Sequence, residues 1–202
     1  MTDAARADTS RAEATRIRLL ESAVEAFAAK GYYGTTTRDI AAAAGMSPAA
    51  LYMHHKSKEE LLYLISRVGH EQIRELITSA VAAPGTPAQR LHGLVRAFAV
   101  EHAGRPAVTR ILNYELAALS AEHLAEIRGI RRETEDAVRA LVEQGVAAGD
   151  FDTPDPKMAV VAVLSLGIDI ARWYRAGGDW SVDEVADRYA EMALRIVGAP
   201  TR

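Results

Sequence analysis

The sequence predicts an all-α protein, and three observations carry that prediction. Hydrophobic residues make up 49% of the chain and aromatic residues only 6%, and alanine, the strongest helix former, dominates the apolar set. Runs of β-branched or aromatic residues that alternate with period two are absent. Capping signals and glycine stops recur along the chain and divide it into helical segments. Its 202 residues suffice for one or two compact domains with a buried core.

The chain opens with a small, polar stretch at residues 1–9, which is expected to be a disordered tail. A first helix is predicted over residues 10–30, because four apolar residues share one face at 3-4-3 spacing: Ile17, Leu20, Val24 and Phe27. Gly31 follows as its C-terminal stop, since glycine readily adopts the left-handed conformation in which many helices end.

Two short helices are predicted next, with Gly45 between them. The first covers residues 36–44, where Thr36 or Thr37 caps the helix and Asp39 lies in the first turn, favourably for the helix dipole. The second begins after Ser47 as N-cap, with Pro48 at the first helical position, where a missing N–H would have been unpaired anyway.

Six further helices are predicted after these three in the sequence. The first starts at the Ser57–Glu60 capping box and runs to about Ala82, before the clearest break in the chain at residues 84–87. The other five start at Thr86-Pro87, Arg105-Pro106 (to about Leu119), Ser120 (to Gly149), Asp155-Pro156 (to about Ala176) and the Ser181–Glu184 capping box (to near Gly198). A front domain at residues 10–56 and a body at 57–202 are therefore expected, although the helix from Ser57 belongs to both.

Residues 35–52 encode two short helices joined by a tight turn, the arrangement of a helix-turn-helix. Ile40, Ala41, Ala44 and Leu51 are spaced to pack the two helices together and onto Phe27. The second helix then presents small residues at its start, which suits entry into the major groove of double-stranded DNA. Ten residues are expected at the DNA, either in the groove or at phosphates: Thr36, Thr37, Arg38, Ser47, Pro48, Ala49, Ala50, Tyr52, His54 and Lys58.

The charge distribution agrees with DNA contact at one end of the chain, although chance surface charge explains it as well. The net charge is −3, yet residues 6–58 carry eight Lys or Arg against five Asp or Glu, a net +3, which leaves −6 for the remainder. A basic head on an acidic body is expected when only one end meets phosphate.

The front of the chain resembles the TetR family of transcriptional regulators over residues 16–62. The matching positions are Phe27, Gly31, Tyr32, Thr36, Thr37, Ile40, Ala41, Ala44, Gly45, Met46, Ser47, Leu51, Tyr52, His54, Lys58 and Leu61. His55 departs from the pattern, because the family usually has phenylalanine there. The resemblance implies a nine-helix homodimer that binds a palindromic operator, most often as a repressor, and is released by a small molecule. The alternative is an ordinary helical hairpin inside a bundle.

Helical bodies bind small molecules between helices, in apolar pockets with a few placed polar groups. Candidates for such contacts are Phe98, Asn113, Glu115, Leu116, Leu166, Asp169, Arg172 and Trp173, each of which has a core or surface role as its alternative. Residues 172–178 also resemble a TetR subgroup with W-Y-R-x-G-G, some members of which respond to acyl-CoA thioesters. That resemblance implies an acyl-CoA-like or other amphipathic effector near Arg172. A hydrophobic drug-like ligand, or a purely structural Trp173 and glycine turn, are the alternatives.

The last two predicted helices carry the expected dimer interface. Val182, Val185, Tyr189, Met192 and Ile196 recur at 3-4-3-4 spacing, which forms a seam for another helix. Residues 158–168, including Val161 and Leu164, are apolar almost all round, which indicates burial on two sides. In the TetR family such helices from two protomers form a four-helix interface. An ordinary intramolecular core is the alternative.

Other functions find little support in the sequence. No catalytic residues, metal ligands or cofactor are expected, because no two of the six histidines have metal-ligand spacing on one helix face and no phosphate loop or nucleophile elbow is present. An architectural DNA-binding protein without effector control is the remaining alternative, but such proteins are usually small and strongly basic. With no cysteine, no secretory signal and no apolar run long enough to span a bilayer, the chain is expected in the cytoplasm and away from membranes.

Overall fold

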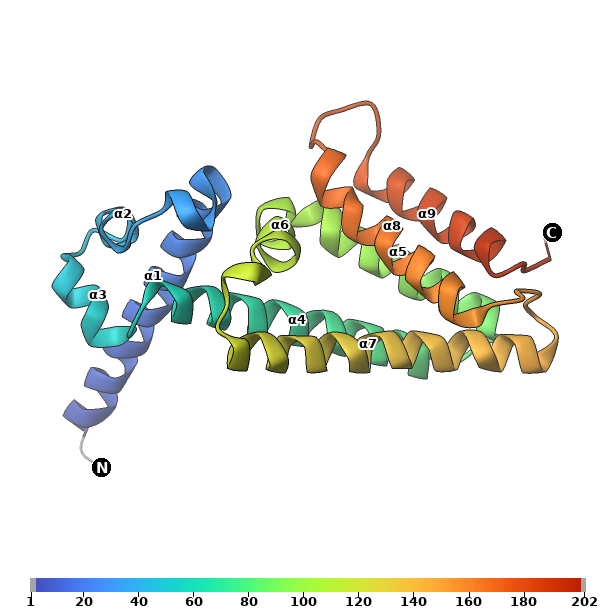
Figure 1. Ribbon diagram of the computed structural model, residues 1–202, viewed down its shortest axis with the longest axis horizontal. Coiled ribbons are helices and arrows are strands. Elements are labelled where there is room, and N and C mark those ends of the chain that lie inside the picture. Colours follow the sequence, from blue (N-terminus) through green and yellow to red (C-terminus); the bar gives the residue numbers. More distant parts are fainter. Residues whose placement is uncertain (1–2, 201–202) are drawn as a thin grey trace. The chain divides into compact units, whose positions relative to one another are not determined.

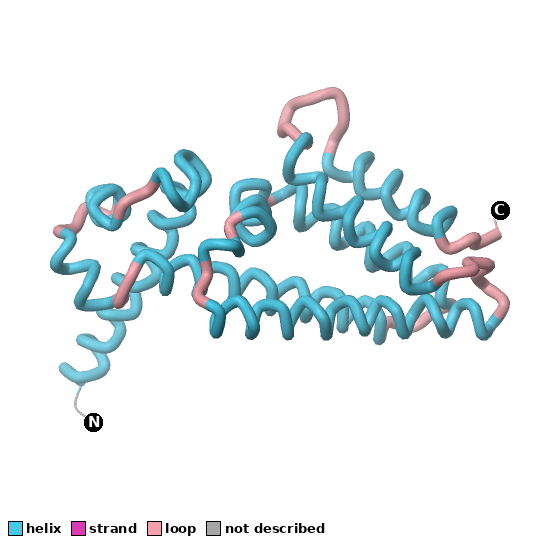
Figure 2. The backbone as a smooth tube through the Cα atoms, in the orientation of Figure 1, coloured by secondary structure: helices cyan, strands magenta, loops and turns pink. Residues whose placement is uncertain are grey.

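The computed structural model describes the backbone of residues 3–200, and these residues form nine α-helices, one short 3-10 turn and no strand (Figures 1 and 2). The all-α prediction is thereby confirmed. The helices are α1 (Asp3–Gly34), α2 (Thr37–Ala43), α3 (Pro48–His54), α4 (Lys58–Ala82), α5 (Pro87–Gly104), α6 (Pro106–Tyr114), α7 (Ala121–Ala148), α8 (Pro156–Trp173) and α9 (Val182–Ile196), with the 3-10 turn η1 (Leu116–Ala118) between α6 and α7.

Most helix starts follow from local capping. The side chains of Thr36, Thr86 and Ser181 each accept a bond from the backbone three residues on, and each cap is completed by a reciprocal acidic or amide side chain. Asp155 caps α8 through the Met158 N–H at 3.0 Å. At α4 only half of the expected box forms: the Glu60 N–H donates to Ser57, whereas the Glu60 carboxylate accepts from the Lys56 N–H.

Three boundaries differ from the predicted ones. Helix α1 begins at Asp3, because residues 3–9 contain no glycine or proline and are rich in alanine; residues 1–2 of the expected tail lie outside the described residues. Helix α6 ends at Tyr114 and continues as the 3-10 turn instead of reaching Leu119. Helix α8 ends at Trp173, where Tyr174 turns into extended backbone.

The chain forms two compact units that are not contiguous blocks of sequence. Unit 1 contains the described residues up to Gly69 together with Arg110–Ala125, and unit 2 contains His70–Thr109 with the residues from Glu126 onward. Helices α4 and α7 each supply residues to both units. The expected division at residue 56 therefore does not coincide with the packing, because the start of α4 and the residues around η1 belong to the same unit as the first three helices.

Unit 1 packs α1, α2 and α3 on one another around side chains with almost no exposure. Its fully buried side chains include Leu19, Phe27, Ile40, Leu51, Leu61 and Leu62. The predicted packing of Ile40, Ala41, Ala44 and Leu51 inside this unit is confirmed, since all four are buried. This core fixes the orientation of α3 relative to α1 and α2.

Unit 2 is built on α5, which lies beside both α8 and α9 (Figure 1). Its main core joins α5, α8 and α9 with the second halves of α4 and α7, through residues such as Ile77, Leu94, Leu141, Val160 and Ala190. A smaller cluster at the other end of α5 contains Ala103, Ile170, Tyr174 and Val185. On the surface, the Arg96 guanidinium donates to Asp183 and Asp187 of α9.

Candidate nucleic-acid interface

The α2–α3 pair is stabilised by two helix N-caps, Thr36 and Ser47, and by the turn at Gly45 between the helices. The Asp39 carboxylate accepts from the Thr36 hydroxyl and N–H and from the Lys30 ammonium, and these bonds, the Thr36 hydroxyl first, hold the pKa of Asp39 down at about 2. Gly45 adopts φ +68°, in the left-handed region where residues with a side chain are strained. The chain can therefore leave α2 and enter α3 within a few residues.

The N-terminal half of α3 presents an exposed surface of small side chains. Ser47, Pro48 and Ala49 are exposed and Ala50 is half-buried, while Leu51 behind them is fully buried. The Ser47 hydroxyl accepts from the Ala50 N–H at 3.2 Å, so that side chain serves as the helix cap. Because no bulky group projects from this end of α3, the helix can approach the floor of a major groove closely.

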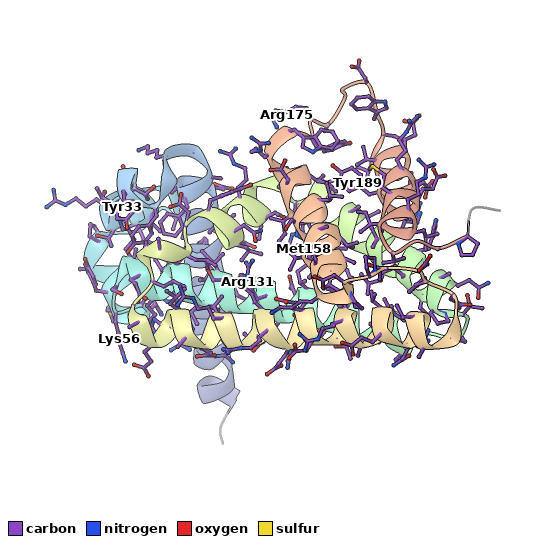
Figure 3. The ribbon with its side chains drawn as sticks, turned by 45° about the vertical axis from the view of Figure 1, so that its right-hand side comes forward. Tyr33, Lys56, Arg131, Met158, Arg175 and Tyr189 are labelled. Atoms are coloured by element: carbon purple, nitrogen blue, oxygen red, sulfur yellow. The ribbon has the colours of Figure 1, made fainter. Side chains whose placement is uncertain are left out.

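Larger exposed side chains surround that surface. Tyr52 is 54% exposed and Met53 is 84% exposed, both on α3. Tyr33 at 78% and the exposed Lys56 lie on either side in sequence and are labelled in Figure 3. Of these four residues only Tyr52 was expected at the DNA from the sequence. Met53 could have been expected as well, because helical spacing places Ala49 and Met53 on the same side of α3.

The residues expected at the DNA outside the start of α3 divide into two groups. Arg38 and Thr36 are exposed, and the Thr37 hydroxyl lies 3.2 Å from the Tyr52 hydroxyl, which ties the start of α2 to α3. Lys58 instead points inward, where its ammonium donates to the carbonyls of Tyr32 (2.8 Å) and Thr35 (2.7 Å). The same ammonium lies 4.0 Å from the centre of the Tyr32 ring. Lys58 therefore stabilises the backbone between α1 and α2 through these two hydrogen bonds. Lys56, two residues after the end of α3, is exposed instead.

His55 is buried in unit 1 immediately after α3. Only 3% of it is exposed, and neither ring nitrogen makes a hydrogen bond of normal geometry. Burial lowers the pKa of His55 from its ordinary value, and the charges of His54 and Arg16 act in the same direction. The Glu60 carboxylate and the Arg16 backbone oppose this shift without reversing it. A neutral imidazole thus occupies a site that suits an apolar ring.

We expect His55→Phe to raise the melting temperature and to remove an acid sensitivity of unit 1. A buried donor without an acceptor costs about 1–3 kcal/mol, and phenylalanine has none. Because the folded-state pKa of His55 lies below the unfolded value of 6.5, the unfolded chain binds the extra proton, so stability falls as pH drops below about 6.5. Thermal unfolding from pH 8 to pH 5 measures both effects. His92→Gln, on α5 in unit 2, is the control and should keep the wild-type slope. An equal slope in His55→Phe would assign the acid sensitivity elsewhere.

The candidate effector residues are divided between the two units. Asn113, Glu115 and Leu116 belong to unit 1, where the Glu115 carboxylate accepts from the Tyr32 N–H at 3.3 Å. The remaining candidates belong to unit 2: Phe98, Leu166, Asp169, Arg172 and Trp173. A groove of about 700 Å³ opens in unit 2 beside the starts of α5 and the ends of α7 and α9, and its described lining includes none of these candidates.

Within unit 2 the α8 candidates have specific neighbours. Phe98 is buried against Gly167, so closely that a Cβ at Gly167 would lie 2.5 Å from the Phe98 ring. Arg172 donates two bonds to the Asp169 carboxylate, at 2.7 and 3.0 Å, on the exposed side of α8. Trp173 lies in an aromatic cluster with Tyr174, Trp180 and Tyr189, at ring separations of 6.1 to 6.3 Å. Leu166 is 39% exposed.

The candidate dimer residues also differ in exposure. Val185 is only 3% exposed and packs in the core with Ile170 and Ala103. Val161 is 41% exposed, next to Met158 at 61% (labelled in Figure 3). The other five, Leu164, Val182, Tyr189, Met192 and Ile196, are half-buried. The exposed apolar surface of unit 2 therefore lies mainly on α8, and Val185 belongs to the intramolecular core.

No cluster of three or more potential metal ligands occurs among the described residues, and none of the described helices is long and apolar enough to cross a membrane.

The capped helix pair, its small-residue surface and the cations around it define a DNA-binding protein of the helix-turn-helix class. Residues 19–63 match the family described as bacterial regulatory proteins, tetR family, and residues 84–197 match the tetracyclin repressor-like C-terminal domain. The chain belongs to the TetR family of transcriptional regulators, as the sequence resemblance predicted.

Several known proteins are similar to this chain along nearly its whole length. The HTH-type transcriptional repressor KstR2 of Rhodococcus jostii (strain RHA1) is 30% identical over 199 residues, 96% of each protein. The structure of a regulatory protein in the tetR family from Rhodococcus RHA1 matches with TM-score 0.88 and 43% identity, over 93% of this chain and 98% of that one. AibR, solved in complex with isovaleryl coenzyme A and operator DNA, matches with TM-score 0.83 and 26% identity, over 92% of this chain and all of that one.

Proposed function

We propose that this protein is a ligand-released repressor that binds a palindromic operator as a homodimer, in the cytoplasm where chromosomal DNA is accessible. The observation that carries the proposal is the small-residue start of α3, which is exposed on a three-helix core with buried apolar side chains and has the exposed cations Arg38 and Lys56 on either side in sequence. Relatives of similar length bear the name of transcriptional repressors, which supports repression. A twofold dimer presents two such helices, and these read two half-sites about one helical turn apart.

The exposed apolar surface of α8 supports the homodimer. Met158, Val161 and Leu166 are all at least 39% exposed on this helix. Apolar side chains grouped in this way commonly mark protein–protein contact. A second protomer packed on α8 and on the half-buried residues of α9 would cover them.

The proposed effector is an acyl-CoA thioester or a similar amphipathic molecule. AibR, which has the same fold, has been solved with isovaleryl coenzyme A bound. In this chain the exposed Arg172 lies in the last turn of α8, Arg175 follows the helix, and the ring of Trp173 contacts the exposed Trp180. Cations and aromatic rings in one segment suit the phosphates and adenine of a nucleotide. The ligand shifts DNA binding only by its different affinity for the DNA-bound and released arrangements.

Two experiments test these proposals separately. Footprinting upstream of the gene and its neighbours should reveal a palindrome with half-sites about one helical turn apart. Binding that depends on duplex length but not on sequence would contradict the repressor assignment and favour an architectural role.

A second experiment adds thioesters of increasing acyl length to the protein on its mapped operator, with free coenzyme A and free fatty acids as controls. We expect a preferred chain length that raises the melting temperature and weakens operator binding by roughly 5–150-fold. If no thioester stabilises the protein or releases it, the acyl-CoA assignment is wrong, while the repressor assignment stands on the footprint.

A further inference from the structure

Residues 110–125 lie in the C-terminal part of the chain but pack as part of the DNA-binding unit. They comprise the end of α6, the turn η1 and the first turn of α7. The family match that covers them begins at residue 84, far from the helix-turn-helix match at 19–63. Two glutamates join this segment to α1 and α4 within unit 1.

Glu115 contacts the backbone where Gly31 interrupts α1. Its carboxylate accepts from the Tyr32 N–H at 3.3 Å, next to Gly31, whose φ of +69° and ψ of 167° interrupt the helix. A Cβ at Gly31 would lie 3.4 Å from the same carboxylate oxygen, so the carboxylate lies directly against this bend. Glu115 is thus hydrogen-bonded to the corner that separates α1 from α2.

Tyr32 connects that corner to α4. Its carbonyl accepts from the Lys58 ammonium, which also lies over its ring, and the ring packs on Phe27 at 5.4 Å. The Lys58 ammonium bonds the Thr35 carbonyl as well, one residue before the Thr36 cap of α2. A displacement of Tyr32 would therefore move both the start of α2 and the start of α4.

Glu59 forms a second connection one residue beyond Lys58. Its carboxylate accepts from the Ser120 N–H and from a ring nitrogen of His123, both at 2.8 Å. The His123 ring stacks on Tyr63 of α4 at 3.8 Å. Burial alone would raise the pKa of Glu59, but the Ser120 and His123 bonds outweigh it and keep the pKa below its usual value. The first turns of α4 and α7 are held together.

We infer that residues 110–125 contribute to DNA binding, although they lie in the C-terminal part of the chain. In this inference Glu115 is a positioning residue, which holds the backbone around Tyr32, between α1 and α2, in the orientation that DNA binding requires. Glu115 touches no DNA in this role. It acts through Tyr32 and Lys58 on the α2 and α3 helices. The inference rests on the helix-turn-helix assignment and is independent of the effector.

The sign of the effect separates this role from simple electrostatics. A carboxylate in a DNA-binding unit repels phosphate, so its removal by itself should leave operator affinity unchanged or raise it slightly. Loss of a positioning hydrogen bond should lower affinity instead. Glutamine removes the charge but keeps an amide oxygen that accepts the same bond.

The test compares Glu115→Ala, Glu115→Gln and Glu122→Ala on the mapped operator at fixed salt. Glu122 is exposed in the same segment, so its alanine variant removes the same charge. We expect Glu115→Ala to bind about tenfold more weakly, since a hydrogen bond to a charged group is lost, and Glu115→Gln to bind within about twofold of wild type. Glu122→Ala should bind as wild type or slightly more tightly.

Amide hydrogen exchange at Tyr32 gives a second readout, faster in Glu115→Ala and unchanged in Glu115→Gln. Equal affinities for Glu115→Ala and Glu122→Ala would overturn the inference. An equal loss in the alanine and glutamine variants would overturn it too. Should Glu115→Ala fail to fold, Glu115→Asp takes its place, because it keeps the charge but shortens the side chain that reaches the Tyr32 N–H. We expect weaker operator binding and faster Tyr32 exchange in Glu115→Asp, and wild-type values for both would overturn the inference. Operator binding by the wild type establishes the regulator assignment whichever result is obtained.

Discussion

Ala49→Trp is expected to reduce specific operator affinity at least about a hundredfold while leaving the fold of unit 1 intact. DNA-binding proteins of this kind bind their specific sites roughly 10³–10⁷ times more tightly than other DNA, and a recognition helix that no longer fits the groove loses most of that difference. Ala49 is exposed in the first turn of α3, between Pro48 and the half-buried Ala50, and its side chain has no role in the core. An indole at this position would meet the base edges before the helix is seated. The cations around α3 remain, so weak sequence-independent binding should persist with nearly the same salt dependence.

The matched control is Ala147→Trp, which adds the same indole to an exposed alanine on α7 in unit 2. This variant should bind the operator as the wild type does. Fluorescence anisotropy with the operator and with a scrambled duplex measures the specific affinity and the sequence-independent affinity. If Ala49→Trp keeps full discrimination between the two duplexes, α3 is not the groove-reading helix.

If the proposed homodimer packs on α8, Val161→Glu is expected to convert it into monomers, with a dimer dissociation constant raised at least about a hundredfold. The cause is a carboxylate buried without a partner in an apolar contact. Val161 is 41% exposed within one protomer, so the substitution spares the core of unit 2. Tyr189→Glu is less informative, because the Tyr189 ring stacks on Trp173 within the same chain. Operator affinity should fall when the dimer is lost, since a monomer reads only one half-site.

Val146→Glu provides the control for Val161→Glu. Val146 lies on α7 with 37% exposure, so the same chemical change is made at nearly the same exposure on another surface. Light scattering at low micromolar concentration should show Val146→Glu as a dimer and Val161→Glu as a monomer. A Val161→Glu variant that is still dimeric under these conditions would place the interface outside α8.

The sequence alone determined the fold class, the helix-turn-helix and the helix starts, except that of α1. These depend on short-range rules: Thr36 caps α2 through Asp39, Gly45 permits the turn, and Ser181 pairs with Glu184, all within three or four residues. The exposure of Ala49 and the burial of Leu51 follow from the same helical spacing. Such signals act before any tertiary contact forms, and a single sequence therefore displays them.

The tertiary structure alone decided what the polar side chains do. Lys58 has the same helical position whether it faces phosphate or the Tyr32 carbonyl, and only the fold of α1 beside α4 selects the carbonyl. Glu115 was a candidate effector contact, yet its hydrogen bond is to a residue 83 positions away. Val185 shares its spacing with a dimer seam but is buried against α5 and α8. Each outcome depends on contacts between distant parts of the chain, and local periodicity contains no information about which distant residues meet.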